Sequence, residues 1–329
     1  MKPRAFPPRE RGAALLAVLL LVAVTGAIAT AAMESLSLSR AAALNVVALD
    51  QGRAYAQAVE QLALLTLDDM AGRNADRTTL DGGWNGAVRR IALPGGGAAQ
   101  VRVRDGGNCF NLNSVVEGDV RTRLVRRQTG VDQFVGLMRA LGVAESEGRR
   151  IAEAAADWAD SDSLPGPAGA EDGAYAAGPD PYRTANTLFA DPGEVRMLAG
   201  MTPEILARLR PWLCALPTAT LSPLNINTLL PEQAPLLAML APGQLDVERA
   251  RRILAGRPAS GWSNQVEFWQ IDALRGLAVP LDAQLQLQMR TQWFALDVVV
   301  TMLDSEFAES ALVDARLQPS RLVSRRWGG

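Results

Sequence analysis

The chain has 329 residues and a formal net charge of −2 at pH 7, with 33 Lys and Arg against 35 Asp and Glu. It contains no His, and Lys2 is its only Lys, which excludes imidazole bases, His-bound zinc, Schiff-base lysines and the P-loop lysine beyond the first residues. This composition argues against an enzyme, although carboxylate-only chemistry such as glycoside hydrolysis stays open, and it gives no basic footprint for nucleic acid.

The chain begins with a short basic leader that runs into a long apolar segment. No charge occurs from Gly12 to Met33, a length that can cross a bilayer. By the positive-inside rule the leader stays in the cytoplasm, and residues after the span lie outside the inner membrane, in the periplasm. The basic residues of the leader are Lys2, Arg4, Arg9 and Arg11, against the single acid Glu10.

Three interpretations of this segment compete. It is a secretory signal cleaved after small residues near Ala29 or Ala31, an uncleaved anchor, or a signal that resembles those of type IV prepilins. In the third, a prepilin peptidase cuts between Gly12 and Ala13 and the apolar run stays on the mature protein. This interpretation explains the Gly at the charged-to-apolar junction.

It also explains why the helical pattern continues beyond the membrane. From Met33 to Leu67 the chain has no Pro and one Gly, with apolar Leu36, Leu44, Val47, Leu49, Val59 and Leu62 among polar residues. We expect one helix of roughly 50 residues, or about 75 Å. The corresponding boundaries are leader 1–12, membrane part 13–33 and periplasmic part 34–70.

Strands are expected on both sides of a long helical region. A weak strand at Ala87–Leu93 precedes a clear alternation at Ala99–Val103, and Asp105–Asn108 then supplies a turn before Cys109–Asn113, which predicts a hairpin. Near the C-terminus, further strands are predicted at Trp293–Met302, Glu306–Leu317 and Arg321–Trp327. The fold class is therefore α+β: a long N-terminal helix on a small antiparallel sheet (71–130 and 288–329), with an inserted all-helical domain (131–287).

The insertion carries clear helix signals. Phe134, Leu137, Met138 and Leu141 share one helix face, and Gly142 ends that helix. A second helix is expected around Ile151–Trp158. Asp191 and Thr202 each precede a Pro and an acid, a combination typical of helix starts.

The two cysteines, Cys109 and Cys214, both fall in the part expected to lie in an oxidising compartment. A disulfide between them is the favoured interpretation, and two buried free thiols are the alternative. The bond would close a loop of about 105 residues and contribute about 4 to 5 kcal/mol.

Carboxylates are concentrated in one Pro- and Gly-rich loop that follows Trp158. Hard oxygen ligands without nitrogen or sulfur suit Ca²⁺, but Pro165 stands where an EF-hand that starts at Asp160 needs Gly, so an irregular calcium loop is expected. A solvated acidic loop and an acid–base pair are the alternatives. The acidic residues concerned are Asp157, Asp160, Asp162, Glu171, Asp172 and Asp180.

A competing pattern lies further along the chain. The segment Leu224–Thr228, a break at Ala241–Leu245 and the basic Val247–Leu254 resemble helix-hairpin-helix modules of surface DNA receptors. Pro242 removes a backbone N–H that such a hairpin would use for phosphate, so nucleic-acid binding is disfavoured.

Several motifs, taken in order, resemble the K class of type II secretion minor pseudopilins (GspK-like). They are Phe110–Asn113, Asp157–Asp162, Gly169–Asp172, Pro181–Asn186 and Asn225–Thr228. Prepilin-like proteins usually place a Glu five residues after the cleavage point, and here that position is Ala17. This departure matches a subunit with no other ahead of it, because the Glu is thought to neutralise the amine of the preceding subunit.

The resemblance implies a structural protein at the tip of the pseudopilus, which caps or initiates assembly with the I and J minor pseudopilins. It further implies a prepilin peptidase and an inner-membrane assembly platform as partners, and Ca²⁺ at Asp160, Asp162, Glu171 and Asp172, with Asp157 and Asp180 as further candidates. Two alternatives stay open at this point: a DNA-uptake pseudopilin and a membrane-anchored carboxylate-dependent hydrolase.

Overall fold

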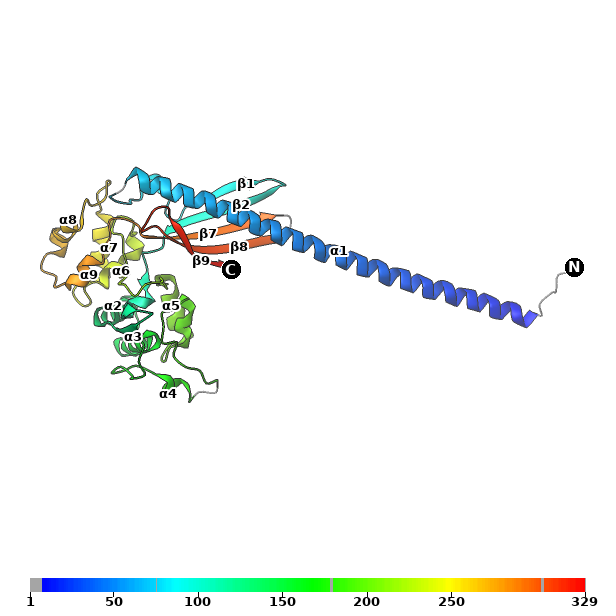
Figure 1. The fold of residues 1–329 in the computed structure, drawn as a ribbon, viewed down its shortest axis with the longest axis horizontal. Coiled ribbons are helices and arrows are strands. Elements are labelled where there is room, and N and C mark those ends of the chain that lie inside the picture. Colours follow the sequence, from blue (N-terminus) through cyan, green and yellow to red (C-terminus); the bar gives the residue numbers. More distant parts are fainter. Residues whose placement is uncertain (1–7, 75, 178–179, 303–304, 329) are drawn as a thin grey trace.

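A long helix carries a sheet and a helical head at its C-terminal end (Figure 1). The computed structural model describes residues 8–74, 76–177, 180–302 and 305–328. The N-terminal end of the helix projects far from the rest of the chain, whereas the C-terminus lies beside the sheet.

Helix α1 runs without interruption from Pro8 to Arg73, over 66 residues or about 100 Å. The prediction of one long helix is confirmed, and the helix passes straight through the Gly12–Ala13 junction. Its most apolar 18-residue window has a mean hydropathy of 2.5 and is not buried in the protein, as a membrane anchor requires.

Only the C-terminal part of α1 packs on the rest of the chain. Small and apolar residues that are buried lie on one helix face, at intervals of three, four or eight residues: Ala48, Gly52, Ala56, Val59 and Leu67. At Gly52 the helix comes so close to strand β8 (Ser305–Asp314) that a Cβ would lie 3.3 Å from Phe307 Cβ. The remaining apolar residues predicted along this helix, Leu36, Leu44, Val47, Leu49 and Leu62, are exposed.

The main sheet is antiparallel, in the order β1-β2-β7-β8-β9, and α1 lies along it over β7 and β8. The C-terminal strands were predicted closely, since β-branched and apolar residues alternate there with polar ones. The strands are β1 (Val88–Leu93), β2 (Gly97–Asp105), β7 (Trp293–Met302), β8 (Ser305–Asp314) and β9 (Arg321–Trp327).

The predicted hairpin after β2 is wrong. β3 (Phe110–Asn111) does not turn back on β2 but pairs in parallel with β6 (Leu213–Cys214), about a hundred residues away. Phe110 to Val116 are buried without alternation, because this segment crosses from the sheet into the interior of the head.

A second short hairpin escaped prediction. β4 (Val116–Asp119) and β5 (Arg123–Arg126) pair through a tight turn between the first β-region and the head helices. Side chains from 110–126, including Leu112 and Leu124, belong to the same apolar core as the head helices, so this stretch packs with the head rather than with the sheet.

The head consists of short helices around one core, with a smaller core between α1 and the sheet. The predicted helix that ends at Gly142 is present, as is the N-cap at Thr202, while the capping box at Asp191 opens a 3₁₀ helix (Pro192–Met197) instead of an α-helix. The α-helices are α2 (Gln128–Ala140), α3 (Glu145–Ala159), α4 (Asp172–Tyr175), α5 (Pro203–Leu209), α6 (Ala234–Ala238), α7 (Val247–Ala255), α8 (Gln265–Trp269) and α9 (Leu281–Leu285).

Candidate functional site

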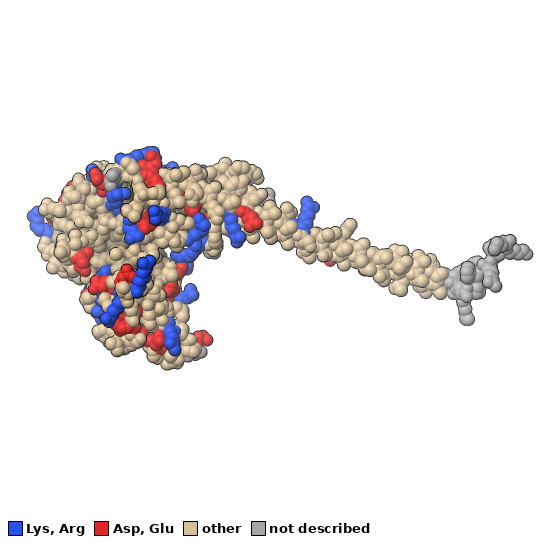
Figure 2. Space-filling view, in the orientation of Figure 1, with Lys and Arg blue, Asp and Glu red and all other residues tan. Residues whose placement is uncertain are grey.

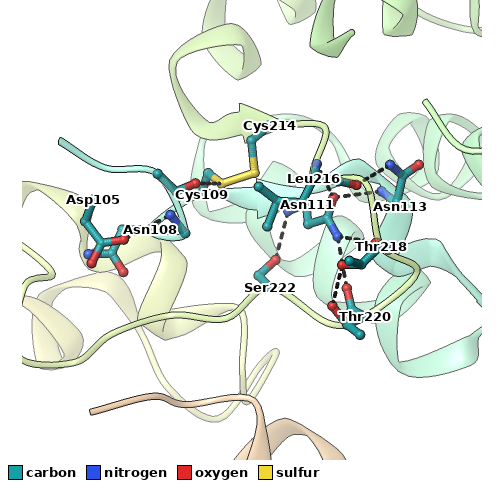
Figure 3. Close-up of a disulfide and its surroundings, with 12 residues drawn as sticks. Asp105, Asn108, Cys109, Asn111, Asn113, Cys214, Leu216, Thr218, Thr220 and Ser222 are labelled. Carbon is teal, nitrogen blue, oxygen red and sulfur yellow. Dashed lines mark hydrogen bonds between the residues drawn. A yellow bond between two sulfur atoms is a disulfide. The ribbon is translucent and has the colours of Figure 1, made fainter. Parts of the chain in front are cut away.

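A disulfide joins Cys109 and Cys214 beside the β3–β6 pair, with the two Cα atoms 5.8 Å apart (Figure 3). Next to it, the Asn111 side-chain oxygen accepts from the N–H groups of Asn113 and Leu216, and its amide donates to Thr218 O and Thr220 O. These bonds satisfy buried and partly buried backbone groups where the chain enters the head, so the disulfide and Asn111 together fix that crossing.

Asp105 links the sheet to the head. It ends β2, and its carboxylate accepts from the hydroxyls of Thr228 (2.6 Å) and Thr291 and from Gly107 N (2.9 Å). Burial raises the pKa of Asp105 to about 6. The hydrogen bonds act in the opposite direction, because they favour the charged form, but burial is the larger effect. The sequence indicated only a turn at this position.

The acidic loop brings three of the predicted metal ligands together. Oxygens of Asp160, Asp162 and Glu171 all lie within 4.8 Å of one another. Asp160 ends α3, which aims it into the loop, and Asp160 and Glu171 are buried. Glu171 Oε1 is also buried, and no described residue offers it a hydrogen bond.

The electrostatics of the cluster favour a bound cation. Burial and the neighbouring Asp162 carboxylate raise the pKa of Asp160 to about 7, and burial also raises the pKa of Glu171. The guanidinium of Arg123 compensates this charge only weakly, because its Nη2 lies 3.4 Å from Asp162 Oδ2 and its side chain is largely exposed. Burial and mutual repulsion thus make it unfavourable to ionise these carboxylates together, and a divalent cation would remove this electrostatic cost.

The other predicted ligands are not members of this group of three. Asp157 faces Gly166, whose N–H lies 3.0 Å from each of its carboxylate oxygens, and it packs so tightly on Gly169 that a Cβ there would clash with it. Asp172 accepts from the N–H of Thr184, and Asp180 is exposed. Asp157 therefore shapes the loop, and Asp172 and Asp180 lie outside the cluster.

Thr184 was not predicted as a site residue. Its hydroxyl is close to Glu171 Oε2 (3.2 Å), Asp172 Oδ1 (3.0 Å) and Asn186 Oδ1 (3.0 Å), so it connects the two acids that follow the loop. The motif Pro181–Asn186 contains it, but its polar residues look like those of any loop.

The exposed part of α1 forms a second functional feature. From Gly12 to Val47 every described side chain is exposed, although most of them are apolar. Figure 2 shows this part of the helix as a largely uncharged rod, with charges concentrated on the head and near it. Such a surface needs a membrane and neighbouring helices to cover it.

The segment considered for DNA binding is occupied by intramolecular contacts. Arg249 Nε donates to Ala273 O at 2.7 Å, and Arg251 pairs with Glu248. The break contains Gly243 at φ 80°, beside Pro242, which has no N–H to donate.

The fold and these features define a membrane-anchored, pilin-like assembly protein. Two family models described as type II secretion system (T2SS), protein K, match residues 108–218 and 224–288. Type II secretion system protein K of Pectobacterium carotovorum is 32% identical over 98% of this chain and 97% of its own length. The Klebsiella pneumoniae protein is 33% identical, covering 97% of each.

A solved structure agrees with this similarity. A chain from the crystal structure of the GspK-GspI-GspJ complex of the enterotoxigenic Escherichia coli type 2 secretion system superposes with a TM-score of 0.73 at 29% identity. The match covers 85% of this chain and 96% of that one. The chain belongs to the type II secretion system protein K family and is a minor pseudopilin of that system.

Proposed function

We propose that this minor pseudopilin occupies the tip of the pseudopilus and starts or caps its assembly from the inner membrane. The observation that carries the proposal is the pairing of an exposed apolar helix, from Gly12 to Val47, with Ala17 in place of a carboxylate. The helix offers an apolar surface to the subunits that stack beneath it in the pseudopilus. Because Ala17 has no carboxylate, the chain has no group that would neutralise the N-terminal amine of a subunit ahead of it.

Processing and topology follow from the same helix. We propose that prepilin peptidase cleaves between Gly12 and Ala13, that the N-terminus faces the cytoplasm, and that the head lies in the periplasm. The basic leader supports this orientation, and the Cys109–Cys214 disulfide suits an oxidising compartment.

The proposed partners are the I- and J-class minor pseudopilins and the inner-membrane assembly platform. Support for the first two comes from the structural neighbour, which was solved as a GspK-GspI-GspJ complex. The helix segment that includes Leu36 and Leu44 would contact them, because both side chains are exposed along the uncovered part of α1.

Photo-crosslinking tests this assignment. The full chain, carrying a photoreactive amino acid at position 36 or 44, is co-expressed with the I- and J-class proteins of the same system. Cross-links to either partner from these positions, and none from position 281 on the head, are the expected result. Cross-links from position 281 alone would contradict the proposal.

We also propose a structural Ca²⁺ held by Asp160, Asp162 and Glu171. The donor set fits, since three carboxylates converge and Glu171 Oε1 is buried without a partner among the described residues. A bound cation would supply positive charge that neutralises the cluster. Other residues of the chain would keep the loop in the conformation that brings the three carboxylates together. Asp157 closes the loop on Gly166, and Thr184 orients Glu171.

We propose no catalytic role. The family to which the chain belongs is structural, and the converging carboxylates are better suited to metal binding than to acid–base chemistry, which requires room for a substrate.

A further inference from the structure

A buried charge cluster joins the assembly helix to the sheet. Glu60 lies on α1, Glu309 on β8 and Arg325 on β9, so the cluster connects three elements that are far apart in the sequence. The side chains of both glutamates are 0% exposed, and that of Arg325 is 26% exposed.

The guanidinium of Arg325 binds both carboxylates. Arg325 Nη2 and Nε donate to the two oxygens of Glu60 at 2.7 and 2.9 Å, and Nε also donates to Glu309 Oε1 at 3.1 Å. Arg325 therefore interacts more strongly with Glu60, through a bidentate bond, than with Glu309, which it contacts through one longer bond.

One positive charge therefore faces two buried carboxyl groups. If both were ionised, a net negative charge would remain on two carboxylates that have no exposed surface, and this is unfavourable. Glu309 Oε2 is buried and receives no hydrogen bond from an amide, hydroxyl or guanidinium of the described chain, while the Glu60 carboxyl lies within hydrogen-bonding range of Glu309. A proton shared by the two carboxyl groups would remove the surplus negative charge.

Within the described part of the chain, Arg325 is the only ion-pair partner of either glutamate. Glu309 lies opposite Val298 on β7 and Trp327 on β9, and Val59 and Phe307 belong to the same core. On α1, the Gln61 amide is close to Glu60 Oε1 (3.3 Å) and the Tyr55 hydroxyl donates to Pro94 O.

Asp105 lies on the same face of the sheet by register, but it ends β2 and accepts hydrogen bonds from Thr228 and Thr291. Other charged residues on these elements point away from the pair. Arg53 on α1 is exposed and lies near Asp50, and Asp68 accepts from Ser320 N. On the strands, Arg102 and Arg104 of β2, Asp297 of β7, Glu306 of β8 and Arg326 of β9 occupy the opposite face of the sheet by register.

We propose that Glu60, Glu309 and Arg325 form a proton-dependent lock, in which one proton shared by the two carboxyl groups holds α1 on the sheet. These contacts hold α1, the helix that enters the pseudopilus, against the sheet that carries the head. Loss of the proton to solvent leaves an uncompensated carboxylate under α1 and loosens the helix from the sheet.

The direction of the pH effect follows from burial. Burial, and then the neighbouring Glu60, raise the pKa of Glu309 to about 7 from its ordinary value of 4.5. A group whose pKa is higher in the folded state stabilises that state fully below its unfolded pKa and loses this contribution as the pH rises through the folded value. The docking of α1 should therefore weaken between about pH 4.5 and pH 7 and then stay constant.

Hydrogen exchange of the full chain in detergent micelles tests the lock. After correction for intrinsic exchange rates, the opening equilibrium of α1 residues 55–67 should be about tenfold or more larger at about pH 8 than at about pH 5. E309Q keeps the side-chain shape but cannot ionise, so this pH dependence should vanish. E60Q leaves Arg325 facing a single carboxylate, so the pH dependence should vanish in this variant as well. E60Q therefore gives a second test if E309Q does not fold.

E306Q, an exposed Glu on the same strand, is the matched control and should retain the wild-type pH dependence. Infrared difference spectra near neutral pH should show a protonated-carboxyl component that E309Q removes and that is separate from the component of Asp160, which D160N removes. The proposal is overturned if both glutamine variants keep the wild-type pH dependence, if E306Q abolishes it, or if E309Q leaves the carboxyl band unchanged.

Discussion

The Thr228 hydroxyl donates a hydrogen bond of 2.6 Å to the carboxylate of Asp105, and this bond ties the end of β2 to the second half of the head. Asn108 donates in turn to Thr228 Oγ1 at 2.9 Å, so the contact belongs to a buried polar network. Where such a network is fully satisfied, it specifies one arrangement of the parts it joins.

Asp105→Asn should change how stability depends on pH. The pKa of Asp105 is raised to about 6 in the folded chain, so its protonation stabilises the fold below pH 3.8 and this contribution is lost as the pH rises through 6. The stability of the wild type relative to the variant should fall by on the order of 2 kcal/mol across this window. Thermal melts of both proteins across the range provide the measurement.

Asp314→Asn is the control for that comparison. Its hydrogen bond to Arg316 lowers the pKa of Asp314 below 3.8, so the difference between wild type and this variant should stay constant above about pH 5. A parallel pH dependence in wild type and Asp105→Asn would show that Asp105 does not titrate in this window.

Calcium should stabilise the full chain. A ligand that binds only the folded state at a hundredfold excess over its Kd adds about 2.7 kcal/mol, which corresponds to a rise in Tm of a few degrees for a domain of this size. Asp160→Asn and Glu171→Gln should each abolish the increase, because they remove members of the converging cluster. Asp180→Asn, at an exposed residue, should keep it. If EDTA leaves the wild-type Tm unchanged, the metal site is refuted.

Removal of the disulfide should destabilise the head. The double variant Cys109→Ser, Cys214→Ser opens a loop with a sequence separation of 105, and the expected loss is about 4 to 5 kcal/mol in urea unfolding. A reductant should lower the stability of the wild type toward that of the variant and leave the variant unaffected. Equal stabilities of the two oxidised proteins would show that the bond adds nothing.

Gly52→Leu should weaken the contact between α1 and the sheet. Any side chain at this position meets Phe307, where even a Cβ would lie at 3.3 Å, and overpacking of this kind costs about 1 to 3 kcal/mol. Gly72→Leu, in the same helix but with open space around it, should not be destabilising. Proteolysis of α1 in detergent measures the difference, and equal protection of both variants would contradict the close approach.

Local patterns predicted those parts of the fold that depend on neighbouring residues. The strands at Trp293–Met302 and Arg321–Trp327 and the long helix carry their periodicity within themselves. The segment from Cys109 to Asn113 was misassigned because its partner, Leu213–Cys214, is distant in sequence and its burial on all sides hides the alternation.

The same distinction applies to the sites. Composition identified the acidic loop, but the convergence of Asp160, Asp162 and Glu171 depends on how the chain wraps around Asp157, which no local pattern reveals. Glu60 and Asp105 looked like ordinary polar residues because their partners come from distant strands and loops. Buried polar contacts between remote segments are therefore what the sequence left unresolved.

The intact mass of the mature protein from the native host tests the central claim most directly. If the apolar helix is retained for assembly, the mature chain should begin at Ala13, with the first 12 residues removed and the whole of the exposed helix present. A mature chain that begins near Thr30 would mean that the helix is a discarded export signal, and would contradict this account.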